Sequence, residues 1–262
     1  KPIKNEIFNW EVNLNFAKNK NVVEQLVEGA DTYQYTVAPF RAQLMAVKGM
    51  AYGQIYGTDF TYDAKGNKIV GANGRYVPSA IKSLGSVLPD YNMGIRNTFK
   101  YKSLSLSFLI DIQKGGKYFS TSHMWGMYSG MLEETALGGN RDQGAILPGV
   151  LADGTPNTKV LDAETWGSTF YNTVDAQNVF DASYIKLRDL TIGFDLPKNW
   201  LANTGLSGMR ISAFGRNLFA WGLDWKGMDP ENVSYGSGNI QGLEGGSLPS
   251  TRTYGFNVSF KF

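Results

Sequence analysis

The residue types that most often do chemistry are scarce in this chain of 262 residues. It has no cysteine, which excludes disulfides, thiol nucleophiles and cysteine-ligated zinc. Its one histidine, His123, would need a nucleophile and an orienting acid for catalysis, and the sequence has no G-x-S-x-G motif. We therefore expect His123 to pack within a loop or to contact a ligand, and we predict no enzyme activity and no catalytic residue.

The acidic residues Asp224, Asp229 and Glu231 are the best candidates for a calcium site, because hard cations bind carboxylate oxygens. Their spacing matches no EF-hand loop, so solvated acids in a turn are the simpler interpretation. Residues 235–246 are rich in glycine but lack the G-x-G-x-x-G pattern between a strand and a helix that binds dinucleotides. We expect no metal and no cofactor.

Large aromatic side chains are the remaining candidates for binding, and aromatic residues make up 13% of the chain. Their faces stack on sugar rings, but they also pack loops together or bind a partner protein. A net charge of +2 gives no broad basic field, so we predict no nucleic-acid partner. The aromatic residues in or beside long loops that we predict to contact a ligand or a partner are Trp125, Tyr128, Trp166, Trp221 and Trp225.

The elements that carry these residues are predicted to be β-strands with alternating faces. In residues 253–262 every second residue is large and apolar, from Tyr254 to Phe262, and the residues between them are polar or glycine. Residues 6–16, 92–101 and 103–113 repeat the pattern. Three further predicted strands, 43–57, 183–196 and 209–220, have blurred faces. A parity shift near Asp189 suggests either a bulge or an upper half of the strand that leaves the apolar zone. The sequence therefore predicts about seven strands.

The connections between these strands are asymmetric. Short links are predicted at residues 101–102 and 197–208, whereas the long segments 58–91, 114–182 and 221–252 all fall at the other end of the sheet. Connections of 30 or more residues are uncommon in compact domains and are usually functional. Residues 17–42 are the exception, because they place a long link at the short-turn end.

Alternating strands occur in soluble β-sandwiches, but three features favour an outer-membrane β-barrel. The apolar faces carry four or five large residues, and a ten-residue strand tilted by about 45° spans an apolar band of about 25 Å. The opposite faces suit a watery lumen, and short turns at one end with long loops at the other are typical of such barrels. No apolar run reaches 18 residues, so no transmembrane helix is expected, and no signal peptide is visible.

Seven strands cannot form a complete barrel with a lumen, since eight already leave almost none. An open sheet in lipid would also leave unpaired backbone groups along both edges, at several kcal/mol each. The predicted fold class is therefore all-β, as one portion of a large antiparallel transmembrane barrel that another segment or chain completes.

Several stretches resemble the SusC/RagA family of TonB-linked outer-membrane transporters of Bacteroidota. They follow one another in the order that the family shows, with residues 114–182 the least informative. The matching stretches are NFAKNKNVV at 15–23, GQIYG at 53–57, ASYIKLRDLTIGFDLP at 182–197, RISAFGRNLF at 210–219, GMDPE at 227–231, PSTRTYGF at 249–256 and the terminal Phe262.

The resemblance implies that residues 1–262 are the C-terminal portion of a 22-stranded barrel, preceded by a plug and the rest of the barrel wall. It also implies a SusD-like surface lipoprotein as partner, coupling to the TonB complex through the plug, and import of large nutrients, either oligosaccharides or peptides. Phe260 and Phe262 would then belong to the terminal signal for barrel assembly, in addition to facing the outer-membrane lipid.

Two alternative functions fit the strands without the resemblance. A surface adhesin or a soluble β-sandwich lectin would use the loop tryptophans for binding and would transport nothing. A passive porin would share the barrel wall but lack a plug and energy coupling.

Overall fold

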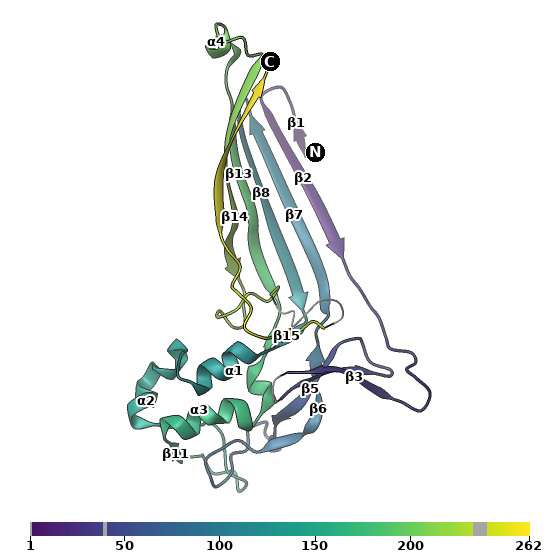
Figure 1. Cartoon of the computed structure of the whole chain (residues 1–262), viewed down its shortest axis with the longest axis vertical. Helices are drawn as coiled ribbons and strands as arrows, with labels where there is room; N and C mark the ends of the chain where they lie inside the picture. Colours follow the sequence, from purple (N-terminus) through teal and green to yellow (C-terminus); the bar gives the residue numbers. More distant parts are fainter. Residues whose placement is uncertain (1, 39–40, 233–239) are drawn as a thin grey trace.

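A long twisted sheet and a packed assembly at one of its ends make up the chain, as the computed structural model shows for residues 2–38, 41–232 and 240–262 (Figure 1). Within these residues, seven strands form the main sheet in the order β1-β2-β7-β8-β13-β14-β16, and every neighbouring pair is antiparallel. The strands are Ile3–Lys4 (β1), Phe8–Ala17 (β2), Pro89–Tyr101 (β7), Leu104–Gly115 (β8), Tyr184–Asp195 (β13), Gly208–Trp221 (β14) and Thr253–Lys261 (β16).

The register of the main sheet aligns apolar residues on one face and polar residues on the other. One row of paired residues crosses six strands on what we call the apolar face: Trp10, Phe99, Leu106, Ile192, Ala213 and Phe256. The next row lies on the polar face: Asn9, Lys100, Ser105, Gly193, Ser212 and Asn257. Because successive strand residues point to opposite sides, the sequence alternation becomes two continuous surfaces.

The bulge predicted near Asp189 is confirmed. The pairing of β13 with both of its neighbours shifts between Leu187 and Asp189. The extra residue in the bulge, Arg188, puts Leu187 and Leu190 on the same face of the sheet, opposite Ile110 and Phe108.

The prediction of a strand over residues 43–57 in the main sheet is wrong. β2 pairs directly with β7, from Phe8 opposite Tyr101 to Ala17 opposite Asn92. The predicted loop 58–91 and the predicted link 17–42 are therefore parts of one connection, residues 18–88. This connection leaves the main sheet at the same end as residues 116–183 and 222–252 (Figure 1). The exception to the asymmetry disappears, since all three long connections share one end.

Residues 43–57 form part of a second sheet, whose order is β3-β4-β5-β6. Leu44, Ala46 and Ile55 are completely buried, and Gln54 on the other face is 4% exposed. Both faces of this strand pair are therefore buried, which explains why residues 43–57 carry apolar residues on both faces. A turn between the two strands contains Gly49 and Gly53, which both have a positive φ. The strands are Thr32–Val37 (β3), Gln43–Val47 (β4), Gln54–Phe60 (β5) and Pro78–Ser86 (β6).

The three long connections fold together into what we call the loop assembly. The second connection supplies helices α1 and α3, and a three-stranded sheet in the order β12-β9-β15 joins it to the third connection. The helices are Thr121–Tyr128 (α1), Asn140–Gln143 (α2) and Ala163–Asn172 (α3), with 3-10 turns Glu133–Thr135 (η1), Leu137–Gly139 (η2) and Asp175–Asn178 (η3). The short strands are Lys117–Ser120 (β9), Ala145–Ile146 (β10), Val160–Leu161 (β11), Val179–Asp181 (β12) and Leu243–Glu244 (β15).

At the other end of the main sheet the connections are short. Lys102 and Ser103 join β7 to β8, and Lys102 takes a positive φ of 51°, as a tight two-residue turn requires. The link between β13 and β14 contains the one-turn helix α4, Lys198–Leu201. The described ends of the chain also lie at this end (Figure 1).

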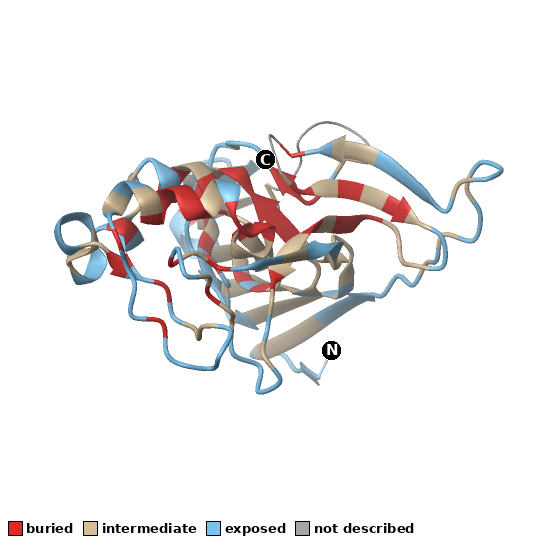
Figure 2. Ribbon diagram, turned by 90° about the horizontal axis from the view of Figure 1, so that it is seen from below, coloured by how far each residue is buried: buried red, intermediate tan, exposed pale blue. Residues whose placement is uncertain are grey.

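The buried core lies in the loop assembly and not in the main sheet. The three clusters of buried apolar residues are built around Trp166, Phe119 and Trp225, all of which belong to long connections. Figure 2 shows the same concentration of buried residues. On β16, by contrast, Phe256 is 83% exposed. The described part of the chain contains no helix long and apolar enough to cross a membrane.

Candidate functional site

The polar face of the main sheet carries a ladder of charges that runs across its strands. Arg96 on β7 lies 3.1 Å from the Asp189 carboxylate on β13, and Arg210 on β14 lies 3.0 Å from Asp195. Arg188 forms an ion pair with Asp111 on β8. Most of these groups are partly exposed in the described chain, which suits side chains that face water.

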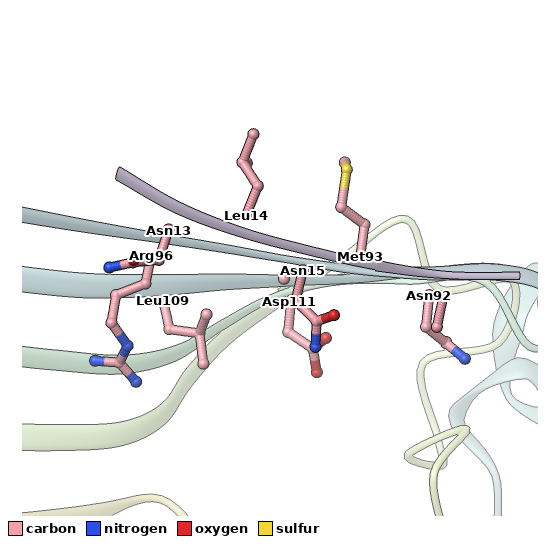
Figure 3. A pocket seen from close by; sticks show the side chains of 10 residues that line it. Asn13, Leu14, Asn15, Asn92, Met93, Arg96, Leu109 and Asp111 are labelled. Carbon is pink, nitrogen blue, oxygen red and sulfur yellow. The ribbon is translucent and has the colours of Figure 1, made fainter. Parts of the chain in front are cut away.

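A hollow of about 460 Å³ lies beside this ladder, near the β2 edge of the sheet. Figure 3 shows Arg96, Leu109 and Asp111 projecting from one side of the strands, and Leu14 and Met93 projecting from the other. The division of the sheet into a polar and an apolar face is therefore visible in single side chains.

Lys186 joins the main sheet to the third connection. Its ammonium lies 2.5 Å from both Asp229 Oδ1 and Glu231 Oε2, and its side chain is 5% exposed. Glu231 also accepts hydrogen bonds of 2.7 Å from both terminal nitrogens of Arg188. Since Lys186 is paired with Asp111 on the polar face, the segment around residue 229 lies over that face.

The two acids of this cluster are held in their charged form. Burial on its own would raise the pKa of Asp229, but hydrogen bonds from Lys186 and Ser250 outweigh it and lower the pKa from its ordinary 3.8. Burial likewise opposes ionisation of Glu231, while hydrogen bonds from Arg188 and Lys186 lower its pKa from 4.5. The carboxylates of Asp229 and Glu231 are therefore both ionised at neutral pH.

The sequence suggests that Asp229 and Glu231 are solvated acids or metal ligands. The structure joins each of them by an ion pair to a basic side chain of β13, and the Glu231 side chain stays 36% exposed. Asp224 is separate from them and accepts a hydrogen bond from the backbone N–H of Asp181 at 2.7 Å. Within the described ranges, no group of three or more His, Cys, Asp or Glu residues is arranged to hold a metal ion.

Glu244 joins the second and third connections and is completely buried. Its Oε2 accepts hydrogen bonds from the Ser120 hydroxyl at 2.8 Å and from the Ser122 N–H at 2.9 Å, and its Oε1 accepts from the Ser122 hydroxyl at 2.8 Å. These donors surround the start of α1, where Ser120 is the N-cap. A carboxylate in this place satisfies helix N–H groups and complements the helix dipole.

Asp175 makes the matching link between the first and second connections. Its carboxylate accepts hydrogen bonds from Thr58 N at 2.7 Å and from Arg41 Nε at 2.5 Å. The close approach requires glycine at position 57, because a Cβ there would lie 2.8 Å from the Asp175 Cβ. Two of the three pairs of long connections are thus joined by an acid with little exposure: Asp175 joins the first to the second, and Glu244 joins the second to the third.

His123 lies inside the loop assembly and is 7% exposed. Its Nδ1 lies 2.9 Å from Asn178 Oδ1, and its ring makes edge contacts with Phe170, Phe180 and Trp225. Burial lowers the pKa of His123 more than the Asn178 hydrogen bond and the nearby Glu134 raise it, so the ring is neutral at pH 7. The structure places His123 as a packing residue of the loops.

Two of the five predicted contact residues lie in the core of the loop assembly. Trp166 is 9% exposed and Trp225 is 8% exposed. Trp166 meets Phe170 edge to face, and Trp225 stacks on Phe180. They hold the loops together, and contact with a ligand or partner stays a prediction for them.

The other three predicted contact residues are more exposed. Trp125 and Tyr128 on α1 form an aromatic group with Tyr171 of α3, and Tyr128 is 43% exposed. Trp221 is the last residue of β14, so it belongs to the main sheet and not to a loop; its ring stacks on Phe219 at the loop end of the apolar face.

The predicted assembly-signal residues lie at the end of the outermost strand. Phe260 on β16 is 55% exposed and shares the face of Phe256, and Phe262, which follows the strand, is 91% exposed. Recognition by an assembly machinery stays a prediction.

Sequence reasoning missed Lys186, Arg188 and Glu244 as the residues that fasten the loops. Lys186 and Arg188 are basic residues that alternate with apolar ones at the start of β13, which is a local signal, but their partners lie more than 40 positions away. For Glu244 we find no sequence signal, since its donors come from another connection.

No family model matches the chain. The TonB-dependent receptors P3 and P26 of Formosa agariphila are 26% and 25% identical to it over 99% and 98% of its length. The chain spans 27–28% of the length of these curated relatives. It is a homologue of part of a SusC/RagA-type TonB-dependent receptor.

Solved structures of SusC/RagA-type receptors share the fold. The RagAB peptide transporter superposes with a TM-score of 0.65 at 18% identity, and the RagAB peptide importer in its open-open state with 0.67 at 17%. Both matches cover 99% of this chain and 27–28% of the solved chain. TonB-dependent receptors are outer-membrane proteins, and the outer membrane is the location of this chain.

Proposed function

We propose that the chain forms the C-terminal part of the barrel wall, together with three extracellular connections, of a TonB-dependent importer of large nutrients. The observation that carries the proposal is the two-faced main sheet whose three long connections leave at one end and fold into one assembly. One side of such a sheet suits lipid and the other suits a watery lumen.

The edges of the main sheet support a larger barrel. Within the described residues, β16 pairs only with β14, and β2 has a partner on its outer side only at Asn9 and Trp10. Two open edges in a bilayer would cost several kcal/mol for each unpaired backbone group, so further strands must continue the sheet on both sides. A 22-stranded barrel of the SusC/RagA type supplies them.

The loop assembly supports a selective mouth in preference to an open pore. The segment around Asp229 lies over the polar face and is bonded to it through Lys186. Loops that fold inward and are fixed there narrow an entrance, which suits an importer with a plug and a lipoprotein lid more than passive diffusion. By this proposal the partners are a plug and the remaining wall from the same transporter, the TonB complex and a SusD-like lipoprotein.

The cargo is an oligosaccharide or a peptide, and the RagAB peptide transporter and importer are precedents for the second. A surface adhesin or a lectin is the alternative from another class. It receives less support, because a soluble sandwich would cover the apolar face of its sheet with a second sheet, whereas Phe256 and Tyr254 on the apolar face of β16 are 83% and 71% exposed.

The parent gene and the intact protein test this function. Sequence upstream of Lys1 should encode a plug domain, and the full-length protein should require detergent for extraction and should change its gel mobility on boiling. A parent sequence without a plug would favour a porin, and extraction in plain buffer would favour the lectin.

A further inference from the structure

A second hollow, of about 430 Å³, lies inside the loop assembly between α1 and the third connection. Its side-chain walls include Trp125, Met131, Leu132 and Trp225, and its backbone walls include Gly227 and Gly246. Met131 is 82% exposed, which is unusual for a large apolar side chain beside buried neighbours. The size falls within the range of about 300–1,000 Å³ that ligand sites occupy.

Two glycines give this hollow its shape. A Cβ at Gly227 would lie 2.2 Å from the Trp225 ring, so only glycine lets the indole lie against the backbone there. A Cβ at Gly126 would lie 2.7 Å from the Leu132 side chain, so glycine in α1 admits Leu132. The hollow is therefore a consequence of specific packing and not of a loosely folded loop.

One wall of the hollow belongs to the segment that is bonded to the polar face of the main sheet. Trp225 and Gly227 precede Asp229 by only a few residues, and Asp229 is bonded to Lys186 on that face. In the proposed barrel the polar face encloses the lumen, which places this segment at the mouth.

The lining discriminates between the two cargo classes. Among the described residues that line it there is no charged side chain and no side-chain amide, only apolar residues, glycines, Thr121 and the serines Ser122 and Ser129. A buried sugar needs hydrogen-bond partners for many hydroxyls, and this lining has few. An apolar side chain needs none, while the peptide groups beside it need only a few donors and acceptors.

We propose that this hollow is a subsite for one apolar side chain of a peptide cargo, with Met131 and Trp125 covering the side chain. The proposal rests on the proposed import function, because it needs the hollow to open toward the lumen. It names peptides with an apolar residue as the preferred cargo.

The test uses the full-length transporter in detergent and isothermal titration with three probes. These are the peptide acetyl-GSGFGSG-amide, the same peptide with Ser in place of Phe, and maltoheptaose. The Phe peptide should bind at least about tenfold more tightly than the Ser peptide, as burial of one aromatic side chain predicts. Maltoheptaose should neither bind at the hollow nor displace the Phe peptide.

Three variants locate the binding. Met131→Ser should weaken binding of the Phe peptide about tenfold, whereas Thr121→Val, which changes only a buried hydroxyl, should leave the affinity unchanged. Leu248→Ser is the matched control, because Leu248 is 85% exposed in the third connection and does not line the hollow. Its affinity for the peptide should stay unchanged, and circular dichroism should show that all three variants are folded.

Equal affinities for the two peptides, or unchanged binding by folded Met131→Ser protein, would overturn the subsite. Displacement of the Phe peptide by maltoheptaose would overturn the assignment to peptides. The titration measures binding without energised transport, so these outcomes do not depend on import. Failure of the import function would appear separately, as a parent gene without a plug domain.

Discussion

Lys186 on β13 and Glu231 in the third connection form an ion pair of 2.5 Å, and this pair fixes an inward-folded loop to the polar face of the main sheet. Lys186 is 4% exposed, so its ammonium has exchanged water for two carboxylates. Removing one partner of such a pair leaves uncompensated charge, which is more costly than the pair itself is stabilising.

Replacing Lys186 with methionine should therefore release the third connection. We expect Lys186→Met to lower the free energy of unfolding by about 3 kcal/mol and to speed proteolysis within residues 222–232. Urea titration and limited proteolysis of the full-length transporter measure both effects. Lys226→Met is the control, because Lys226 is exposed in the same segment. Equal behaviour of the two variants would contradict the anchoring role.

Glu244 should be needed as a carboxylate and not merely as a polar residue. In Glu244→Gln the amide NH2 group would face N–H and O–H donors of Ser120 and Ser122 and could not accept from them. We expect this change to lower the free energy of unfolding by about 1–3 kcal/mol. Hydrogen exchange of the first turn of α1 should become faster, while Glu164→Gln, an exposed acid in the first turn of α3, should leave both helices unchanged. Unchanged exchange in Glu244→Gln would show that the charge is dispensable.

The ion pairs that anchor the third connection should weaken at acidic pH. The pKa values of Asp229 and Glu231 are lowered in the folded state, so the stability they contribute is fully present above their ordinary values of 3.8 and 4.5 and is lost as pH falls through the lowered values. Hydrogen exchange within residues 222–232 should thus be constant from pH 7 to about 4.5, after correction for its intrinsic pH dependence, and should increase below that. In the double variant Asp229→Asn, Glu231→Gln this acid transition should disappear; its persistence would assign it to other groups.

Much of the main sheet could be predicted from local patterns. The alternation in β16 and β8 is nearly complete, because each of these strands separates two different environments along its whole length. The Asp189 bulge was predictable for the same reason, since one extra residue reverses the parity. Residues 43–57 were assigned wrongly because a strand pair buried on both sides resembles a poorly alternating membrane strand.

The loop assembly could not be predicted in the same way. Its contacts join residues far apart in sequence, such as Asp175 with Arg41 and Thr58, and no hydrophobic periodicity along the sequence indicates such pairs. Aromatic residues in loops can pack inward or face a ligand, and composition does not distinguish Trp166 from Tyr128. Only the fold separates the buried residue from the exposed one.

The two faces of β13 should tolerate charge differently in the membrane. Ile192 lies on the apolar face and is 53% exposed, whereas Thr191 lies on the polar face opposite Ser107. Ile192→Arg should reduce the stability of the full-length protein refolded in vesicles by about 2–4 kcal/mol if the residue lies near the bilayer midplane, and by less nearer the interface. Thr191→Arg should cost less than 1 kcal/mol. Similar losses in the two variants would contradict the assignment of the faces.

The most direct test of the central claim, that one face of the main sheet meets lipid and the other meets water, is a spin-label scan of β16 in the full-length transporter in vesicles. The chain has no cysteine of its own, so single cysteines can be introduced at positions 254–259. Labels at 254, 256 and 258 should be relaxed by oxygen dissolved in lipid, and labels at 255, 257 and 259 by a water-soluble nickel chelate. Access of the chelate to both sets alike would contradict the claim.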